Sequence, residues 1–117
     1  MKLLLVAIAA VAFFAAQDST VYTPGNGVSL PKVTREVRPE YSNEARENHI
    51  EGVVMLDAVV LSDGAVGDVE IAESLDTMYG LDANAVKAMK QWQFEPGKKD
   101  GKPVAVQIHV QMKYTLK

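Results

Sequence analysis

The chain has 117 residues, no cysteine and a formal net charge of −3. This length supports one modest domain with its own core, and 48% hydrophobic with 23% charged residues is an ordinary globular composition. The missing cysteine excludes disulfides, thiolate metal ligands and a thiol nucleophile. The acidic balance argues against a wide basic surface, so we expect no nucleic-acid partner.

The N-terminus predicts export. One basic residue precedes an apolar run over residues 3–16, and polar residues follow it. This pattern is typical of a secretory signal peptide, and the run is shorter than the roughly 20 residues that span a bilayer. Phe14 stands where cleavage after Ala16 favours a small residue. A short uncleaved anchor is therefore the alternative, and only that form would be membrane-associated.

Residues 17–31 are expected to form an extended leader with a turn at residues 24–27, and residues 32–117 to form the domain. Residues 28–30 could form a short strand. Within the domain, Ser42 is a suitable N-cap for a short helix that stops before Gly52. Residues 53–61 and 66–73 predict two strands, and Asp63-Gly64 supplies the tight turn between them.

Residues 81–92 show helical spacing, with an apolar stripe and Asp82 as a plausible cap. Trp92 and Phe94 end that stripe, so we expect them in the core between helix and sheet rather than as an exposed anchor. The last strand, residues 104–114, alternates most regularly. One face carries the apolar set Val104, Val106, Ile108, Val110, Met112 and Tyr114, and the other carries Ala105, Gln107, His109, Gln111 and Lys113.

This order of elements resembles the TonB C-terminal domain family. The matching residues are Pro39-Glu40-Tyr41, Ala45-Arg46, Glu51-Gly52-Val53-Val54, Ser62-Asp63-Gly64, Leu81-Asp82, Ala85, Ala88, Trp92-Gln93-Phe94-Glu95-Pro96 and Gly101-Lys102-Pro103. The resemblance implies an α+β fold: a three-stranded antiparallel sheet with two helices packed on one face. It also implies a periplasmic protein, with an inner-membrane anchor as the alternative.

The resemblance further implies a protein partner, such as the TonB box of an outer-membrane receptor, docked by strand addition during transmembrane transport. An open sheet edge can accept an extended peptide because its backbone groups are unpaired. The residues expected at that site are Arg38, Pro39, Val104, Val106, Gln107, Ile108, His109, Gln111 and Lys113. The alternative is a structural or oligomerisation module of the cell envelope, in which the same strand pairs with a second copy as a homodimer or is covered by the leader.

The sequence offers no basis for catalysis. It has no nucleophile-elbow serine, no glycine-rich loop before a helix and no HExxH motif. His49 and His109 are its only histidines and lie on different expected elements, so we expect no metal site and no cofactor. We therefore predict a binding protein that is not an enzyme.

Overall fold

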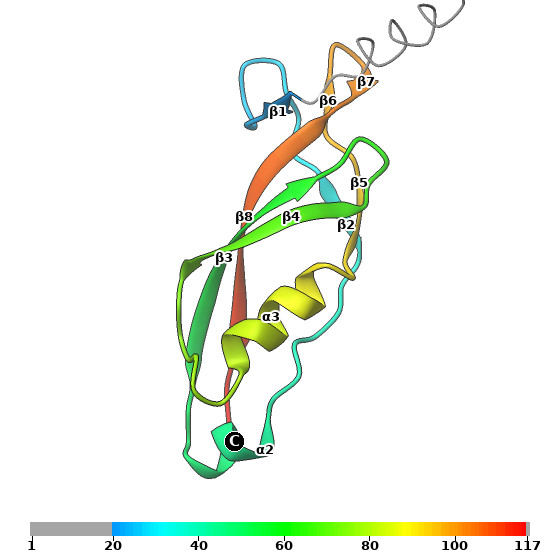
Figure 1. Ribbon diagram of the computed structural model, residues 1–117. Helices are drawn as coiled ribbons and strands as arrows, with labels where there is room; N and C mark the ends of the chain where they lie inside the picture. Colours follow the sequence, from blue (N-terminus) through cyan, green and yellow to red (C-terminus); the bar gives the residue numbers. More distant parts are fainter. Residues whose placement is uncertain (1–19, 117) are drawn as a thin grey trace, which may run out of the picture.

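The computed structural model describes residues 20–116 (Figure 1), and its main sheet has four strands. Their spatial order is β1-β8-β3-β4, with bounds Val21–Tyr22, Ala105–Tyr114, Gly52–Val60 and Val66–Glu73. β8, β3 and β4 pair antiparallel, whereas β1 runs parallel to β8. The α+β prediction with two helices is correct. The prediction of three strands is wrong because a two-residue strand from the N-terminal segment joins the sheet.

The register of β3 and β8 follows from burial. Leu56 lies opposite Val110 and Val54 opposite Met112. On β3, Val54, Leu56, Ala58 and Val60 are all buried. A slip of β8 by one residue would bury its polar set beside these side chains, so the apolar alternation specifies this register.

Two helices complete the domain. α2 (Asn43–Glu47) begins at Ser42, whose hydroxyl accepts from the Ala45 amide at 3.2 Å, as predicted. α3 (Leu81–Met89) lies across one face of the sheet and buries Leu81, Ala85, Ala88 and Met89 against it. It ends three residues before the predicted end. The amides of Gln91 and Trp92 donate to carbonyls only three residues back, so the last turn tightens and leaves α-helical geometry.

Two buried carboxylates organise the loop before α3. Asp76 accepts from the amides of Met78, Tyr79 and Leu81. Asp82 reaches back from the first turn to the amides of Leu75 and Asp76, both at 2.9 Å. Burial favours a higher pKa for Asp82, but hydrogen bonds from Asp76, Ser74 and Leu75 together hold its pKa below the ordinary value. Asp82 thus ties the loop to the first turn of α3. The prediction that Asp82 caps the helix is wrong, because Gly80 holds the N-cap position and the Leu81 amide donates to Asp76.

Two separate two-stranded sheets hold the remaining segments. β2 (Lys32–Arg35) pairs with β5 (Gln93–Glu95), and β6 (Lys98–Lys99) pairs with β7 (Lys102–Pro103). Trp92 and Phe94 are 8% and 6% exposed, which confirms their predicted place in the core. The Trp92 indole donates to the Val37 carbonyl at 2.8 Å and so fixes the chain after β2.

The segment expected to be a loose leader is packed in part. Val28 is buried and bridges to Lys99, and the Ser29 amide donates to the Lys98 carbonyl at 2.9 Å. The predicted signal peptide over residues 1–16 lies outside the described residues. Within residues 20–116, no helix is long and apolar enough to cross a membrane.

Candidate functional site: the open edge of the C-terminal strand

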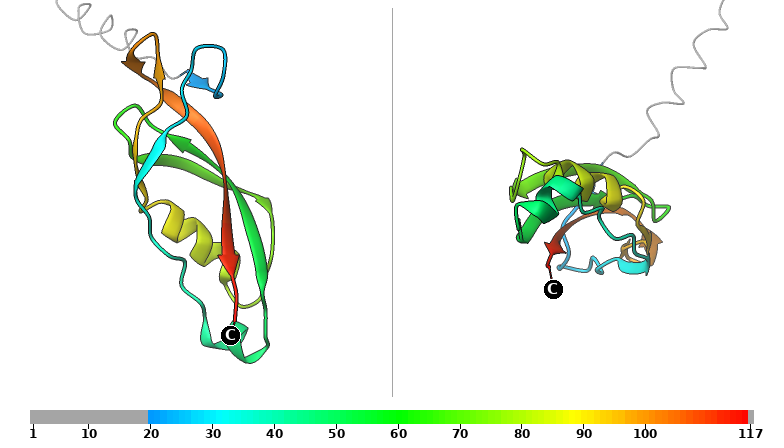
Figure 2. Two further views of the ribbon diagram at one scale, coloured as in Figure 1. Left: turned by 180° about the vertical axis from the view of Figure 1, so that it is seen from behind. Right: turned by 90° about the horizontal axis from the view of Figure 1, so that it is seen from below.

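β8 has two different neighbours along its length. On one side β3 pairs with it from Val106 to Tyr114. On the other side β1 pairs with it only at Ala105 and Val106. In the part of the chain that the structure describes, no strand follows β1 along that side. The edge from Gln107 to Tyr114 is therefore open, and Figure 2 shows β1 only near the start of β8.

The first two residues expected at the site lie at the covered end. The Val104 amide donates to the Gly97 carbonyl at 2.9 Å. Val106 is fully buried, with Val60 of β3 on one side and Tyr22 of β1 on the other. These two residues therefore lie outside the open part of the edge, which begins at Gln107.

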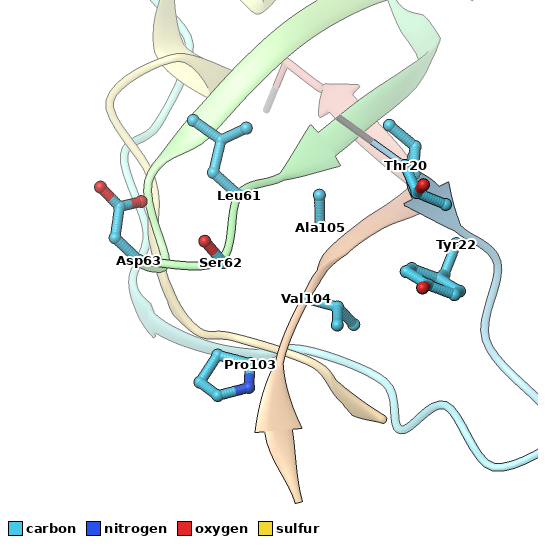
Figure 3. A pocket seen from close by; sticks show the side chains of 9 residues that line it. Thr20, Tyr22, Leu61, Ser62, Asp63, Pro103, Val104 and Ala105 are labelled. Atoms are coloured by element: carbon cyan, nitrogen blue, oxygen red, sulfur yellow. The ribbon is translucent and has the colours of Figure 1, made fainter. Parts of the chain in front are cut away.

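A hollow of about 510 Å³ lies at this covered end (Figure 3). Its walls come from β1, from the turn between β3 and β4, and from the start of β8: Thr20, Val21, Tyr22, Leu61, Ser62, Asp63, Pro103, Val104 and Ala105. Val104 is thus a wall residue of this hollow rather than part of the free edge.

The open part carries the other β8 residues expected at the site. Ile108 is 8% exposed and packs in the core, while His109, Gln111 and Lys113 are exposed on the opposite face. Gln107 is half-buried on that same face. His109 lies directly opposite Asp57 of β3, with Nδ1 2.5 Å from the carboxylate Oδ1. The polar row of β8 therefore borders an accessible backbone edge.

A groove of about 420 Å³ lies at the far end of this edge, and we call it the basic groove. Its walls are Arg38, Pro39, Tyr41, Arg46, Lys113, Tyr114 and Thr115. Arg38 and Pro39 are the two expected site residues outside the last strand, and the structure brings them together with Lys113. Sequence reasoning missed Arg46, which α2 brings to the same groove.

Two tyrosines hold the basic groove in shape. The Tyr114 hydroxyl lies 2.9 Å from the Leu81 carbonyl and 3.3 Å from the Glu40 carbonyl, which links β8 to α3 and to the chain before α2. The Tyr41 ring packs edge-on against Tyr114 with centroids 5.1 Å apart, and its hydroxyl donates to the Ile50 carbonyl. The Arg46 guanidinium lies 4.9 Å from the centre of the Tyr41 ring.

The surroundings of these tyrosines shift their ionisation. Burial, reinforced by Asp82 and Asp76 and by Tyr41 and Glu40, raises the pKa of Tyr114 to about 12. Desolvation and then Glu51 raise the pKa of Tyr41, while Arg46 opposes that shift. Both hydroxyls therefore keep their protons, and remain hydrogen-bond donors, throughout the neutral range.

The site has no feature of a metal centre. Among residues 20–116, no group of three or more His, Cys, Asp or Glu side chains is placed to hold a metal ion. What the site presents is a backbone edge, a polar row and a basic groove.

The sequence of this chain matches a known protein family and several of its members. The model of the family described as "Gram-negative bacterial TonB protein C-terminal" matches residues 37–116. Protein TonB of Vibrio cholerae is 37% identical over 84 residues, which cover 72% of this chain and 34% of that protein. Protein tonB2 of Pseudomonas aeruginosa is 38% identical over 64 residues, 55% of this chain and 23% of that protein. The chain thus spans about a third or less of these relatives.

A solved structure shares the fold. The solution NMR structure of the Pseudomonas aeruginosa TonB CTD superposes with a TM-score of 0.57 at 26% sequence identity, and the match covers 86% of this chain and 99% of that structure.

Proposed function

Because this chain belongs to the Gram-negative bacterial TonB C-terminal family, we propose that it docks an extended segment of a partner protein onto the open edge of β8 in TonB-linked transport. The observation that carries the proposal is the unpaired edge from Gln107 to Tyr114, which ends in the basic groove. The backbone groups of such an edge supply affinity, and the flanking side chains supply specificity.

The partner that we propose is the TonB box of an outer-membrane receptor, met in the periplasm. The docked segment would lie along β8 with Gln107, His109, Gln111 and Lys113 beside it and with Arg38 and Pro39 across the groove. Ile108 would act from beneath by packing the strand on the core. Force transmission is no part of the proposal, because the matches cover only 34% and 23% of the lengths of these relatives.

Peptide titration with backbone NMR tests this role. A seven-residue extended peptide should shift the outward amides of Gln107–Tyr114, while the amides of β4, the other edge of the sheet, stay in place. β4 serves as an internal control because it is also an edge strand, but its exposed residues include the acidic Asp68, Glu70 and Glu73. Equal shifts along β4, or none along β8, would contradict docking at this edge.

Proline substitution tests whether the backbone makes the contact. Gln107 and Val110 are an odd number of residues apart, so their amides point to opposite sides of β8. One of the variants Gln107→Pro and Val110→Pro removes a backbone N–H that points to the open edge. The other removes a backbone N–H that donates a hydrogen bond to β3. The variant that keeps its melting temperature should bind the peptide at least about tenfold more weakly. Normal binding by that variant would exclude strand addition.

The same edge supports a second function, self-pairing of two copies. Sedimentation at micromolar concentration separates the two, because a stable dimer that the folded proline variant abolishes would favour an oligomerisation module. A monomer that binds peptide supports the docking role.

A further inference from the structure

A short strand from the N-terminal segment closes the start of the β8 edge. β1 lies opposite Ala105 and Val106 of β8, and the edge is open from Gln107 onward. The two strands run in the same direction, so β1 points along β8 toward the open part. A partner segment on this edge would therefore lie end to end with β1.

The chain turns back directly after β1. Pro24 has no backbone N–H to add to a ladder with β8. The backbones of Gly25 and Val28 then exchange two hydrogen bonds, of 2.9 and 3.1 Å. Between them, Asn26 and Gly27 have φ of 52° and 88°, and a tight type I′ hairpin turn requires positive φ at both of these positions. β1 thus ends where the open part of the edge begins.

Contacts with both residues of β6 hold this turn and β1 in place. Val28 is buried and bridges to Lys99. The Ser29 amide donates to the Lys98 carbonyl, and the Lys98 amide donates to the Ser29 hydroxyl, both at 2.9 Å. The Lys99 ammonium lies 5.0 Å from the centre of the Tyr22 ring, which is a cation–π contact. The Tyr22 end of β1 is therefore tied to the folded domain.

We propose that β1 is a fixed stop for the docked segment, which sets where the segment begins on β8 and limits its pairing to the eight residues Gln107–Tyr114. This inference rests on the proposed function and adds the length and register of the partner segment. Without a stop, an alternating strand could slip by two residues and keep the same side chains on each face. The partner that fits is an extended segment of about 26 Å, whose chain leaves the sheet beside Tyr22.

Three peptides of one non-repeating extended sequence, with blocked ends, test this stop on the full chain. One has eight residues, to match the open part of the edge. The other two carry four more residues, added before the first residue in one peptide and after the last residue in the other. A segment parallel to β8 brings its N-terminal extension to β1, and an antiparallel segment brings its C-terminal extension there. In the wild-type protein, the extension that meets β1 should change the affinity by less than about twofold, because β1 occupies the places with which it would pair.

Val21→Gly with Tyr22→Gly should lift the limit, because two glycines weaken β1 and release the edge at Ala105 and Val106. In this double variant, one extended peptide should bind about three- to tenfold more tightly than the eight-residue peptide, through the added backbone hydrogen bonds. Which extension it is gives the strand direction. Thr23→Gly is the matched control, because it places a glycine one residue beyond β1 and should keep the wild-type limit.

Backbone NMR of the wild-type protein checks the stop without any substitution. With the extended peptides bound, the signals of Val21 and Tyr22 should match those in the complex with the eight-residue peptide. Whichever of the Ala105 and Val106 amides faces β1 should stay protected from exchange. Moved β1 signals together with lost protection would show that the longer segment displaces β1, and the proposal would be wrong.

The outcomes separate the two proposals. If no peptide shifts the signals of Gln107–Tyr114, the docking role fails and this inference fails with it. If all three peptides bind there but the double variant and the wild-type protein gain equally from each extension, docking stands and the stop is wrong. A gain from one extension that the double variant shows, and that the wild-type protein and Thr23→Gly lack, supports both.

Discussion

The two ends of β8 differ in what lies beside them. At the start, Val106 has β3 on one side and β1 on the other, β1 also pairs with Ala105, and Gly97 lies close to the Val106 side chain. At the far end one side is free and faces the basic groove. Sheet edges tend to pair uncontrollably unless they are covered or charged. This strand uses both protections, with coverage where its surroundings are apolar and charge where it stays open.

Gly97→Ala should break the covered end and give the largest effect. A Cβ there would lie 2.5 Å from the Ser29 carbonyl oxygen and 2.7 Å from a Val106 methyl carbon. We expect the free energy of unfolding in urea to fall by about 1–3 kcal/mol. Gly67→Ala is the matched control, because its Cβ meets only the Leu61 side chain, which is exposed and can move. Equal losses in both variants would contradict tight packing at this end.

Tyr114→Phe should weaken the far end next. Losing the hydroxyl leaves the Leu81 carbonyl without this donor, so we expect a loss of about 1 kcal/mol at neutral pH. Because the folded pKa of about 12 lies above the ordinary value of 10.0, wild-type stability is complete below pH 10 and falls as pH rises toward 12. Urea titrations across that range should show a shallower fall in the variant. An unchanged slope would contradict the shifted pKa.

A double substitution in β1, Val21→Gly with Tyr22→Gly, should expose the covered end of β8, so that both ends of this strand have a free edge. Successive amides of a strand point to opposite sides, so one of the Ala105 and Val106 amides faces β1. We expect that amide to exchange as fast as the outward amides after Gln107, at a loss of about 1 kcal/mol in stability. Thr23→Gly, one residue beyond the strand, should leave its exchange slow. Slow exchange in the double variant would mean that β1 does not cover the edge.

His109→Gln should have the smallest effect. The His109 side chain is 72% exposed and Asp57 is 28% exposed, so water screens the contact between them. We expect a change in unfolding free energy of less than about 0.5 kcal/mol, measured with Asp57→Asn in a double-mutant cycle. A coupling above about 1 kcal/mol would show that this pair is a structural element of the edge.

Sequence reasoning succeeded where a pattern repeats over many residues. The strand over residues 66–73 is correct to the residue, and the last strand differs by one residue at its start. The core positions of Trp92 and Phe94 also followed from periodicity. β1 has two residues and pairs with β8 from more than 80 residues away, so no local pattern marks it. Arg46 was missed for a related reason, because a short helix gives no hint of which distant strand its exposed face meets.

The hydrogen bonds of Tyr114 also fix the spacing between the walls of the basic groove. The Tyr114 hydroxyl lies within hydrogen-bond distance of the Leu81 carbonyl in the first turn of α3 and of the Glu40 carbonyl. These contacts hold the segment that bears Arg38 and Pro39 at a fixed distance from β8 in the free protein. In the proposed docking role, a partner segment would meet a preorganised opening, because the entropy of forming that opening is lost on folding rather than on association.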